Sequence, residues 1–416
     1  MKMNMVPAST IPRRAFGVNR LFCALSNFRF RPPSRDRKAG GLLTLLSFAA
    51  VLGGLPAVAD IAWDRGSVTL KTELLSQYDS NIFSNRSETA DWHSVLTPSA
   101  NFVRDAGLIR LSANGGVSLQ HFQDNSTEDS TDPFVYATAN LVPQEDSKID
   151  GSFETFLRRR SDANVDVNTR ARVEEFDVKA SFKHFPFEKI GYRISGDIFD
   201  QNFLLRGMSD IRTKSLDGEG RYHFSPKADV FAGIGGRWSS NYHLAPGSAP
   251  MDSEDVKFKV GLDGEILPKV SGRVAAGYVH RRFRTMQGGT QSGALYDTAL
   301  QWRPDNEMTV TLRANRDFDT TPLDQSVMRF VAGLEAWREV REKVRIMAGI
   351  SYSESKYIGV GVLRLDETYA GTAGMMYSFT NRFKGGANLS YATTKSNFAF
   401  ADYGRFIGGI SLALTF

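Results

Sequence analysis

The segment VKFKVGLDGEI, residues 256–266, alternates apolar and polar side chains with a period of two. In an extended chain, Val256 and Phe258 point to one side and Lys257 and Lys259 point to the other. This period is typical of a β-strand with one apolar and one wet face, whereas an amphipathic helix repeats its apolar positions every three or four residues. The same alternation recurs along most of the chain. The sequence therefore predicts an all-β protein.

The connections between these strands alternate between tight turns and longer polar loops. The predicted turns, rich in Pro, Gly and acidic residues, lie near 104–107, 143–146, 186–188, 226–229, 268–269, 304–306, 340–342 and 380–382. The predicted loops lie near 79–91, 123–132, 159–169, 201–211, 241–253, 285–292, 317–325, 355–366 and 395–402. Eight turns and nine loops separate eighteen strands. The pattern predicts a transmembrane antiparallel up-and-down β-barrel, with periplasmic turns and outer loops.

Residues 1–59 differ from the rest and predict a signal peptide with a long basic n-region. An apolar run at 41–55 follows a basic stretch, and Ala57 and Ala59 form a small-x-small cleavage site. The alternative is a membrane anchor, but a run of this length is too short to span a bilayer comfortably. The expected domains are the signal peptide and an outer-membrane barrel over residues 60–416.

Removal of the predicted signal peptide changes the charge of the chain. The full sequence has 51 Lys and Arg and 46 Asp and Glu, but the signal peptide holds nine of the bases and one acid. The remaining 42 bases and 45 acids give no basic surface for nucleic acid, so no nucleic-acid partner is expected. The one cysteine, Cys23, also lies in the signal peptide, so we expect no disulfide or thiol chemistry.

A soluble β-sandwich has the same alternation, with its apolar faces turned inward. Three features favour the membrane barrel: the secretion signal, the spacing of the strands, and aromatic residues near predicted strand ends, where the membrane interfaces lie, namely Trp92, Tyr192, Trp238, Tyr278, Trp302, Trp337 and Tyr377. The last predicted strand alternates up to Phe416, which resembles the signal that the barrel-insertion machinery of the outer membrane recognises. We therefore expect the protein in the outer membrane of a Gram-negative bacterium.

Catalytic and metal-binding motifs are absent from the sequence. It has no Gly-x-Ser-x-Gly, His-Glu-x-x-His or Cys-based metal pattern, so we expect neither an enzyme nor a cofactor. An acidic loop could hold Ca²⁺ through Asp124, Glu128, Asp129 and Asp132, with a solvated loop as the alternative.

Charged residues predict the lining of the barrel and its mouth. The alternation assigns both signs of charge to the lumen: Arg110, Lys148, Asp150, Glu154, Asp177, Lys179, Arg193, Asp197, Asp217, Glu219, Arg221, Lys257, Lys259, Asp263, Glu265, Arg313, Arg329 and Glu335. Such a lumen is wet and weakly charge-selective, since a selective pore needs a ring of one sign. Two basic clusters fall at outer strand ends: Arg158, Arg159, Arg160, Arg281, Arg282 and Arg284. They form either an electropositive mouth or a grip on lipopolysaccharide phosphates.

The motifs near the first predicted loop carry a family resemblance. The succession Tyr78-Asp-Ser-Asn-Ile82, Asp91-Trp92 and Asn125-Ser-Thr-Glu-Asp129 resembles the putative beta-barrel porin 2 family of bacterial outer-membrane proteins. The resemblance implies a passive conduit that exports an exopolysaccharide, with outer-membrane lipid around it and periplasmic polysaccharide-export components as partners.

Two other hypotheses stay open. A general diffusion porin for small solutes would place a long constricting loop in the lumen, but the longest predicted loops, near 79–91 and 241–253, are of modest length. A structural or adhesion barrel would have a closed lumen, but the sequence predicts no extended extracellular domain.

Overall fold

The computed structural model describes residues 61–142, 148–167, 169–244, 251–284, 289–358 and 363–416. The predicted signal peptide with Ala57 and Ala59, the predicted turn at 143–146 and parts of four predicted loops lie outside the described residues. No helix among the described residues is long and apolar enough to span a membrane.

The described residues form nineteen strands and two short 3₁₀ turns. The strands are β1(Ile61–Trp63), β2(Gly66–Asp79), β3(Asp91–Asp105), β4(Ile109–Phe122), β5(Ser130–Leu141), β6(Ile149–Asn164), β7(Thr169–His184), β8(Ile190–Phe203), β9(Asp210–Ser225), β10(Ala228–Tyr242), β11(Ser253–Leu267), β12(Val270–Phe283), β13(Thr290–Trp302), β14(Met308–Thr320), β15(Ser326–Arg341), β16(Val344–Ile358), β17(Arg364–Ser378), β18(Phe383–Ser396) and β19(Tyr403–Thr415). The turns are η1(Ser126–Glu128) and η2(Ala399–Ala401).

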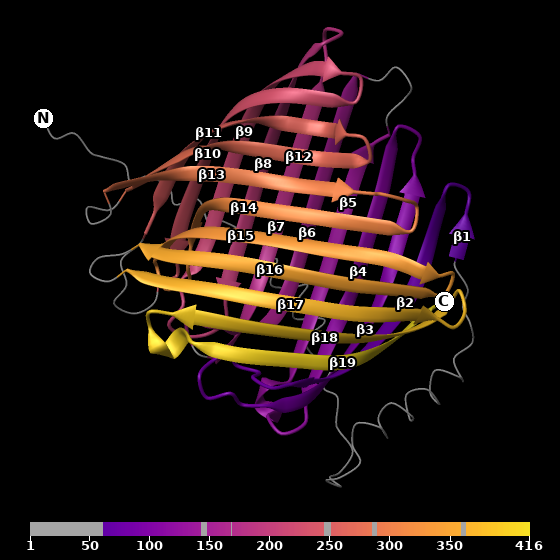
Figure 1. The fold of residues 1–416 in the computed structure, drawn as a ribbon, viewed down its shortest axis with the longest axis vertical. Helices are drawn as coiled ribbons and strands as arrows, with labels where there is room; N and C mark the ends of the chain where they lie inside the picture. The colour runs from indigo at the N-terminus through magenta and orange to yellow at the C-terminus, as the bar shows by residue number, and fades with distance from the viewer. Residues whose placement is uncertain (1–60, 143–147, 168, 245–250, 285–288, 359–362) are drawn as a thin grey trace, which may run out of the picture. The chain divides into compact units, whose positions relative to one another are not determined.

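Strands β2 to β19 close into one antiparallel barrel of eighteen strands. Each strand pairs with the next in sequence, and β19 pairs with β2, with Ile410 opposite Ser76. Figure 1 shows β13 to β19 side by side in one wall, with the strands of the N-terminal half crossing behind them. The short β1 pairs only with the start of β2. The predicted fold class and strand number are confirmed, and closure pairs the backbone groups that an open edge would leave bare in lipid.

The seam between the first and last strands is tied by side chains as well as by backbone. Asp79 of β2 is fully buried, and the Arg405 guanidinium of β19 donates to both of its carboxylate oxygens. Asn81, just after β2, donates from its side chain to the carbonyl oxygen of Gly404, 3.0 Å away. The Tyr-Asp-Ser-Asn-Ile motif, read as a family signature, thus holds the barrel closed near its outer rim.

The apolar face of each strand points outward. Val260 is 61% exposed and Ile350 is 67% exposed. Lys257 and Lys259, on the same strand as Val260, are ion-paired on the other face. A soluble sandwich buries these apolar side chains, so this arrangement excludes it. Six of the seven aromatic residues predicted at the interfaces are exposed on the outer face.

Trp337 is the exception, and that prediction is wrong for it. Its indole nitrogen donates to Glu335, two residues away on the same face of β15. Gly333, on the same face of β15, pairs with the lumen-facing Arg313 of β14. Trp337 therefore lies on the lumen side, near the turns. Because residues two apart on a strand share a face, the position of Glu335 fixes that of Trp337.

We predict that Ile350→Arg destabilises the barrel because it places a cation in the lipid region in the middle of β16. The expected loss in free energy of unfolding is about 2–4 kcal/mol. Denaturant unfolding of the protein in phospholipid vesicles, followed by tryptophan fluorescence, measures it. Ser351→Arg is the matched control, since Ser351 is exposed on the lumen face and should tolerate arginine. Equal losses for the two variants would contradict this orientation of the strand.

Candidate functional site

Charged side chains of both signs lie on the strand face opposite the exposed apolar residues. On β7 to β12, lysine or arginine side chains pair with carboxylates of the same strand or of other strands: Lys179 with Asp177, Lys259 with Asp217, Arg221 with Glu219 and Asp263, and Lys257 with Asp317. Near the turns, the pairs are Arg110 with Asp105, Asp150 with Lys183, and Glu265 with Lys227. By register, Glu154, Arg193, Asp197, Arg313, Arg329 and Glu335 share this face, and Lys148 precedes β6.

These ion pairs form a network rather than separate pairs. Arg221 is almost fully buried and contacts the carboxylates of Glu219, Asp229 and Asp263. Arg273 of β12 reaches the same Glu219, with Nη2 2.6 Å from Oε1. The buried Arg221 and Glu219 therefore each have opposite charges within hydrogen-bond distance, which offsets the cost of removing them from water. A wall with alternating signs has no ring of one charge.

The tip of the β14–β15 hairpin leaves the wall. β13 and β14 pair only between Tyr296–Arg316 and Trp302–Val310, so the last residues of β14 have no partner on β13. β14 and β15 stay paired to the end of the hairpin. Phe318 packs with Val279 and Leu295, which are lumen-side residues of β12 and β13. The tip, residues 317–326, is therefore folded into the lumen, and we call it the inward hairpin.

Ion pairs and hydrogen bonds tie the inward hairpin to β10, β11 and β12. Asp317 accepts from Arg237 at 2.9 Å and from Lys257 at 2.5 Å. The Arg281 guanidinium donates to the backbone oxygen of Asp319 at 3.0 Å and to the Ser326 hydroxyl at 2.9 Å.

The turn of the inward hairpin reaches the connection between β8 and β9. There the backbone N–H of Ser209 donates to the Pro322 oxygen at 2.8 Å, and the Ser209 hydroxyl donates to Asp324 at 2.8 Å. Asn241 of β10 also donates to Asp324. The turn therefore contacts elements that lie four or five strands away around the barrel.

A second crossing lies at the outer end of the barrel. Asp166, in the connection after β6, accepts from the Tyr357 hydroxyl at 3.0 Å and from Arg364 at 2.9 Å. Tyr357 ends β16 and Arg364 begins β17, about half-way around the barrel from β6. The contact therefore runs from one wall to the opposite wall and divides the mouth.

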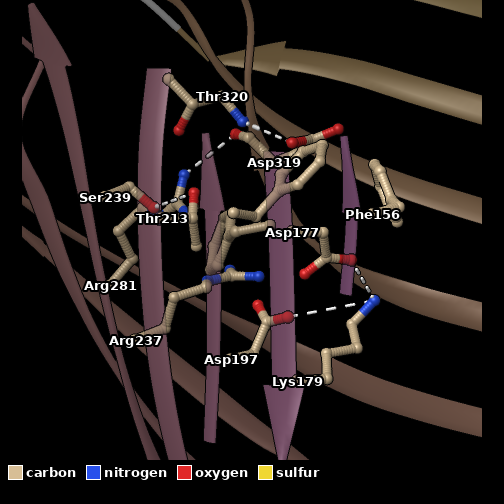
Figure 2. Close-up of a pocket in the computed structure, with 12 residues that line it drawn as sticks. Phe156, Asp177, Lys179, Asp197, Thr213, Arg237, Ser239, Arg281, Asp319 and Thr320 are labelled. Carbon is tan, nitrogen blue, oxygen red and sulfur yellow. Dashed lines mark hydrogen bonds and ion pairs between the residues drawn. The ribbon is translucent and has the colours of Figure 1, made fainter. Parts of the chain in front are cut away.

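A cavity of 370 Å³ lies between the inward hairpin and the wall. Phe156, Asp177 and Asp197 line it from the wall, and Phe318 lines it from the hairpin. Figure 2 shows dashed lines from Lys179 to the carboxylates of Asp177 and Asp197, with Arg237 and Arg281 in the same cavity. Among the described residues, no His, Cys, Asp and Glu side chains gather to hold a metal ion.

The predicted basic clusters are divided between the two faces. Arg158 and Arg160 turn to the lumen and share Glu175, at 2.6 and 2.9 Å. Arg281 is not a rim cation, since its side chain is 1% exposed and bonded to Asp255 within the lumen. The outward residues are Arg159, Arg282 and Arg284. Arg159 is ion-paired with Glu174 and Arg284 with Glu254, and Arg282 lies opposite Glu254 in the strand register.

Loop length does not predict the inward hairpin. The connection itself is short, residues 321–325, and the constriction consists mainly of strand residues. The segment Asp317-Phe318-Asp319 carries no signal of it, because carboxylates on either side of a ring follow the ordinary alternation of a wall strand. Arg237 and Asp255, which tie the hairpin, were also missed.

A closed barrel with apolar side chains outside and ion pairs inside defines an outer-membrane β-barrel with a polar lumen. Residues 65–416 match the putative beta-barrel porin 2 family, and the chain belongs to this family. It is therefore an outer-membrane protein of the Gram-negative type, with a porin fold rather than an enzymatic one.

Two solved structures illustrate what the chain is similar to. The chain is similar to the outer membrane protein OpdK from Pseudomonas aeruginosa, at 9% identity and a TM-score of 0.43, over 84% of this chain and 99% of that one. It is also similar to the siderophore receptor PirA from Acinetobacter baumannii, at 8% identity and a TM-score of 0.42, over 84% and 80% of the two chains. No curated protein matches the sequence.

We predict that Asp255→Ala destabilises the barrel by about 3–5 kcal/mol, because it leaves the buried Arg281 without its carboxylate. Denaturant unfolding in vesicles measures the loss. Glu254→Ala is the control, since the neighbouring Glu254 lies on the outer face and pairs with the exposed Arg284. A loss as small for Asp255→Ala as for the control would show that the lumen pair carries no net stability.

Proposed function

We propose that the protein is a passive channel for small hydrophilic solutes across the outer membrane. The observation that carries the proposal is the inward hairpin, which is tied by Asp317 to Arg237 and Lys257 and narrows a wet lumen. A polymer conduit needs an unobstructed passage, whereas a diffusion channel needs a constriction that sets the size limit. The constriction that the diffusion-porin hypothesis required is thus present, although it is a strand tip and not a long loop.

The mixed charges of the lumen make this channel weakly charge-selective. Lys257, Arg237 and Asp317 lie together at the hairpin, and Arg221 and Arg273 are each paired with carboxylates. Because both signs alternate around the passage, a cation and an anion of the same size meet similar barriers. Size and hydrogen bonding then decide which solutes pass.

Export of an exopolysaccharide is the second candidate. Aromatic rings on the lumen face favour it, since Tyr136 and Phe156 lie 5.6 Å apart where a sugar chain could stack on them. In this function, periplasmic polysaccharide-export components would supply the polymer and the inward hairpin would have to move. Normal polymer secretion by a clean deletion strain would exclude this candidate.

Three further assignments remain proposals. The outward Arg159, Arg282 and Arg284 suit contact with lipopolysaccharide phosphates at the outer rim. Phe416 would serve the barrel-insertion machinery as its recognition residue. Residues 1–59 would be removed as a signal peptide.

We predict that Asp317→Ala raises the single-channel conductance, because it frees the inward hairpin from Arg237 and Lys257. Loss of about 3 kcal/mol at this tie would shift the docked hairpin toward release by about two orders of magnitude. Recordings in planar bilayers, with protein purified from outer membranes, measure the change.

Asp297→Ala is the matched control for this prediction. It removes one negative charge from the lumen face of β13, where Asp297 pairs with Arg273, and leaves the hairpin contacts intact. Both variants should become slightly more anion-selective, but only Asp317→Ala should gain conductance. A bilayer that stays silent with the unaltered protein would refute the channel itself.

A further inference from the structure

Four aromatic rings form a continuous row on the lumen face of β5, β6 and β8. The ring centroids of Phe134 and Tyr136 are 5.7 Å apart, those of Tyr136 and Phe156 are 5.6 Å apart, and those of Phe156 and Phe199 are 6.3 Å apart. The strand register places all four rings on the face that carries Asp177. We call these four residues the lumen aromatic row.

The row runs toward the constriction. Phe134 lies near the outer end of β5, whereas Phe156 and Phe199 line the 370 Å³ cavity opposite Phe318 of the inward hairpin. All four rings are half-buried and not enclosed in a core. Apolar ring faces that meet water cost free energy. The row therefore suits a ligand with apolar faces.

Carboxylate oxygens with unused hydrogen-bonding capacity border the row. Asp177 is 4% exposed; its Oδ2 accepts from Lys179 at 2.7 Å, and its Oδ1 has no hydrogen-bond partner among the described residues. Oδ1 of Asp197, in the same cavity, also lacks one and lies 3.9 Å from Lys179 Nζ (Figure 2). Such oxygens accept hydrogen bonds from ligand hydroxyl groups.

The ion-paired groups beside the row carry both signs of charge. They are three cations and four carboxylates: Arg158, Arg160, Lys179, Asp162, Glu175, Asp177 and Asp197. The Arg158 guanidinium also lies 5.1 Å from the Phe156 ring centroid and donates to the Tyr136 hydroxyl. Because each of these cations is already ion-paired, the border offers hydrogen-bond donors and acceptors rather than a free cation, which suits a neutral ligand.

We propose that the lumen aromatic row is a binding site for neutral saccharides that pass through the channel. The C–H faces of pyranose rings pack on aromatic rings, and their hydroxyls pair with carboxylate acceptors and arginine donors. The steps between the rings, 5.6 to 6.3 Å, are similar to the repeat of sugar units in an extended glycan. The proposal rests on the channel function and adds a substrate class to it.

Binding of maltohexaose and cellohexaose, two neutral glucose oligomers, tests the site. Titration calorimetry of the intact protein in detergent measures binding, and block of single-channel current measures it independently in a bilayer. Phe156→Ala removes the ring in the middle of the row, and we expect binding to weaken at least tenfold. Phe153→Ala is the matched control, because Phe153 lies on the same strand but is 42% exposed on the lipid face.

The two readouts separate failure of the site from failure of the channel. Calorimetric binding that depends on Phe156 supports the site even if the bilayer stays silent, in which case the channel function fails. Currents that neither hexasaccharide blocks, with no calorimetric binding, overturn the site alone. Ring-dependent binding of spermidine without hexasaccharide binding also overturns it, in favour of organic cations. Phe156→Leu replaces Phe156→Ala if the latter does not assemble, as judged by heat-modifiable migration.

Discussion

The pairing of backbone groups in lipid is the constraint on which the rest of the structure depends. No water is available there, so every strand needs a partner on both sides, and the sheet must close. β19 meets β2, and the buried Asp79 with Arg405 ties this seam. Closure then fixes the faces: apolar side chains such as Ile350 meet lipid, and polar ones have only the lumen left. The channel interior follows from this division.

Inside the barrel, charge pairing replaces the apolar core of a soluble protein. Asp255 accepts from both Arg237 and Arg281, and these arginines also hold the inward hairpin through Asp317 and the backbone of Asp319. Removing one partner of such a buried pair strands the other charge, which is far costlier than losing a surface pair. The same contacts that stabilise the wall therefore fix the constriction.

The period of two could predict the strands and their faces, because lipid and lumen impose it along every strand in the wall. Segment 256–266 stays paired on both sides, so alternation assigns its faces correctly. Alternation assigns a face only while a strand stays in the wall. Phe318 leaves it where pairing with β13 stops, so its lumen position follows from tertiary contacts. Arg281 was assigned to the rim from its place near a strand end, although its register with Asp255 puts it inside. The aromatic row joins three strands, and no single segment displays it.

The measurement that most directly tests a lumen narrowed by the inward hairpin is polymer exclusion in planar bilayers. Single-channel currents of the protein are recorded with poly(ethylene glycol) of increasing size in the bath. The structure predicts discrete, weakly selective steps and exclusion of all but the smallest polymers. Steps that large polymers still reduce would contradict the constriction, and the absence of any steps would contradict an open lumen altogether.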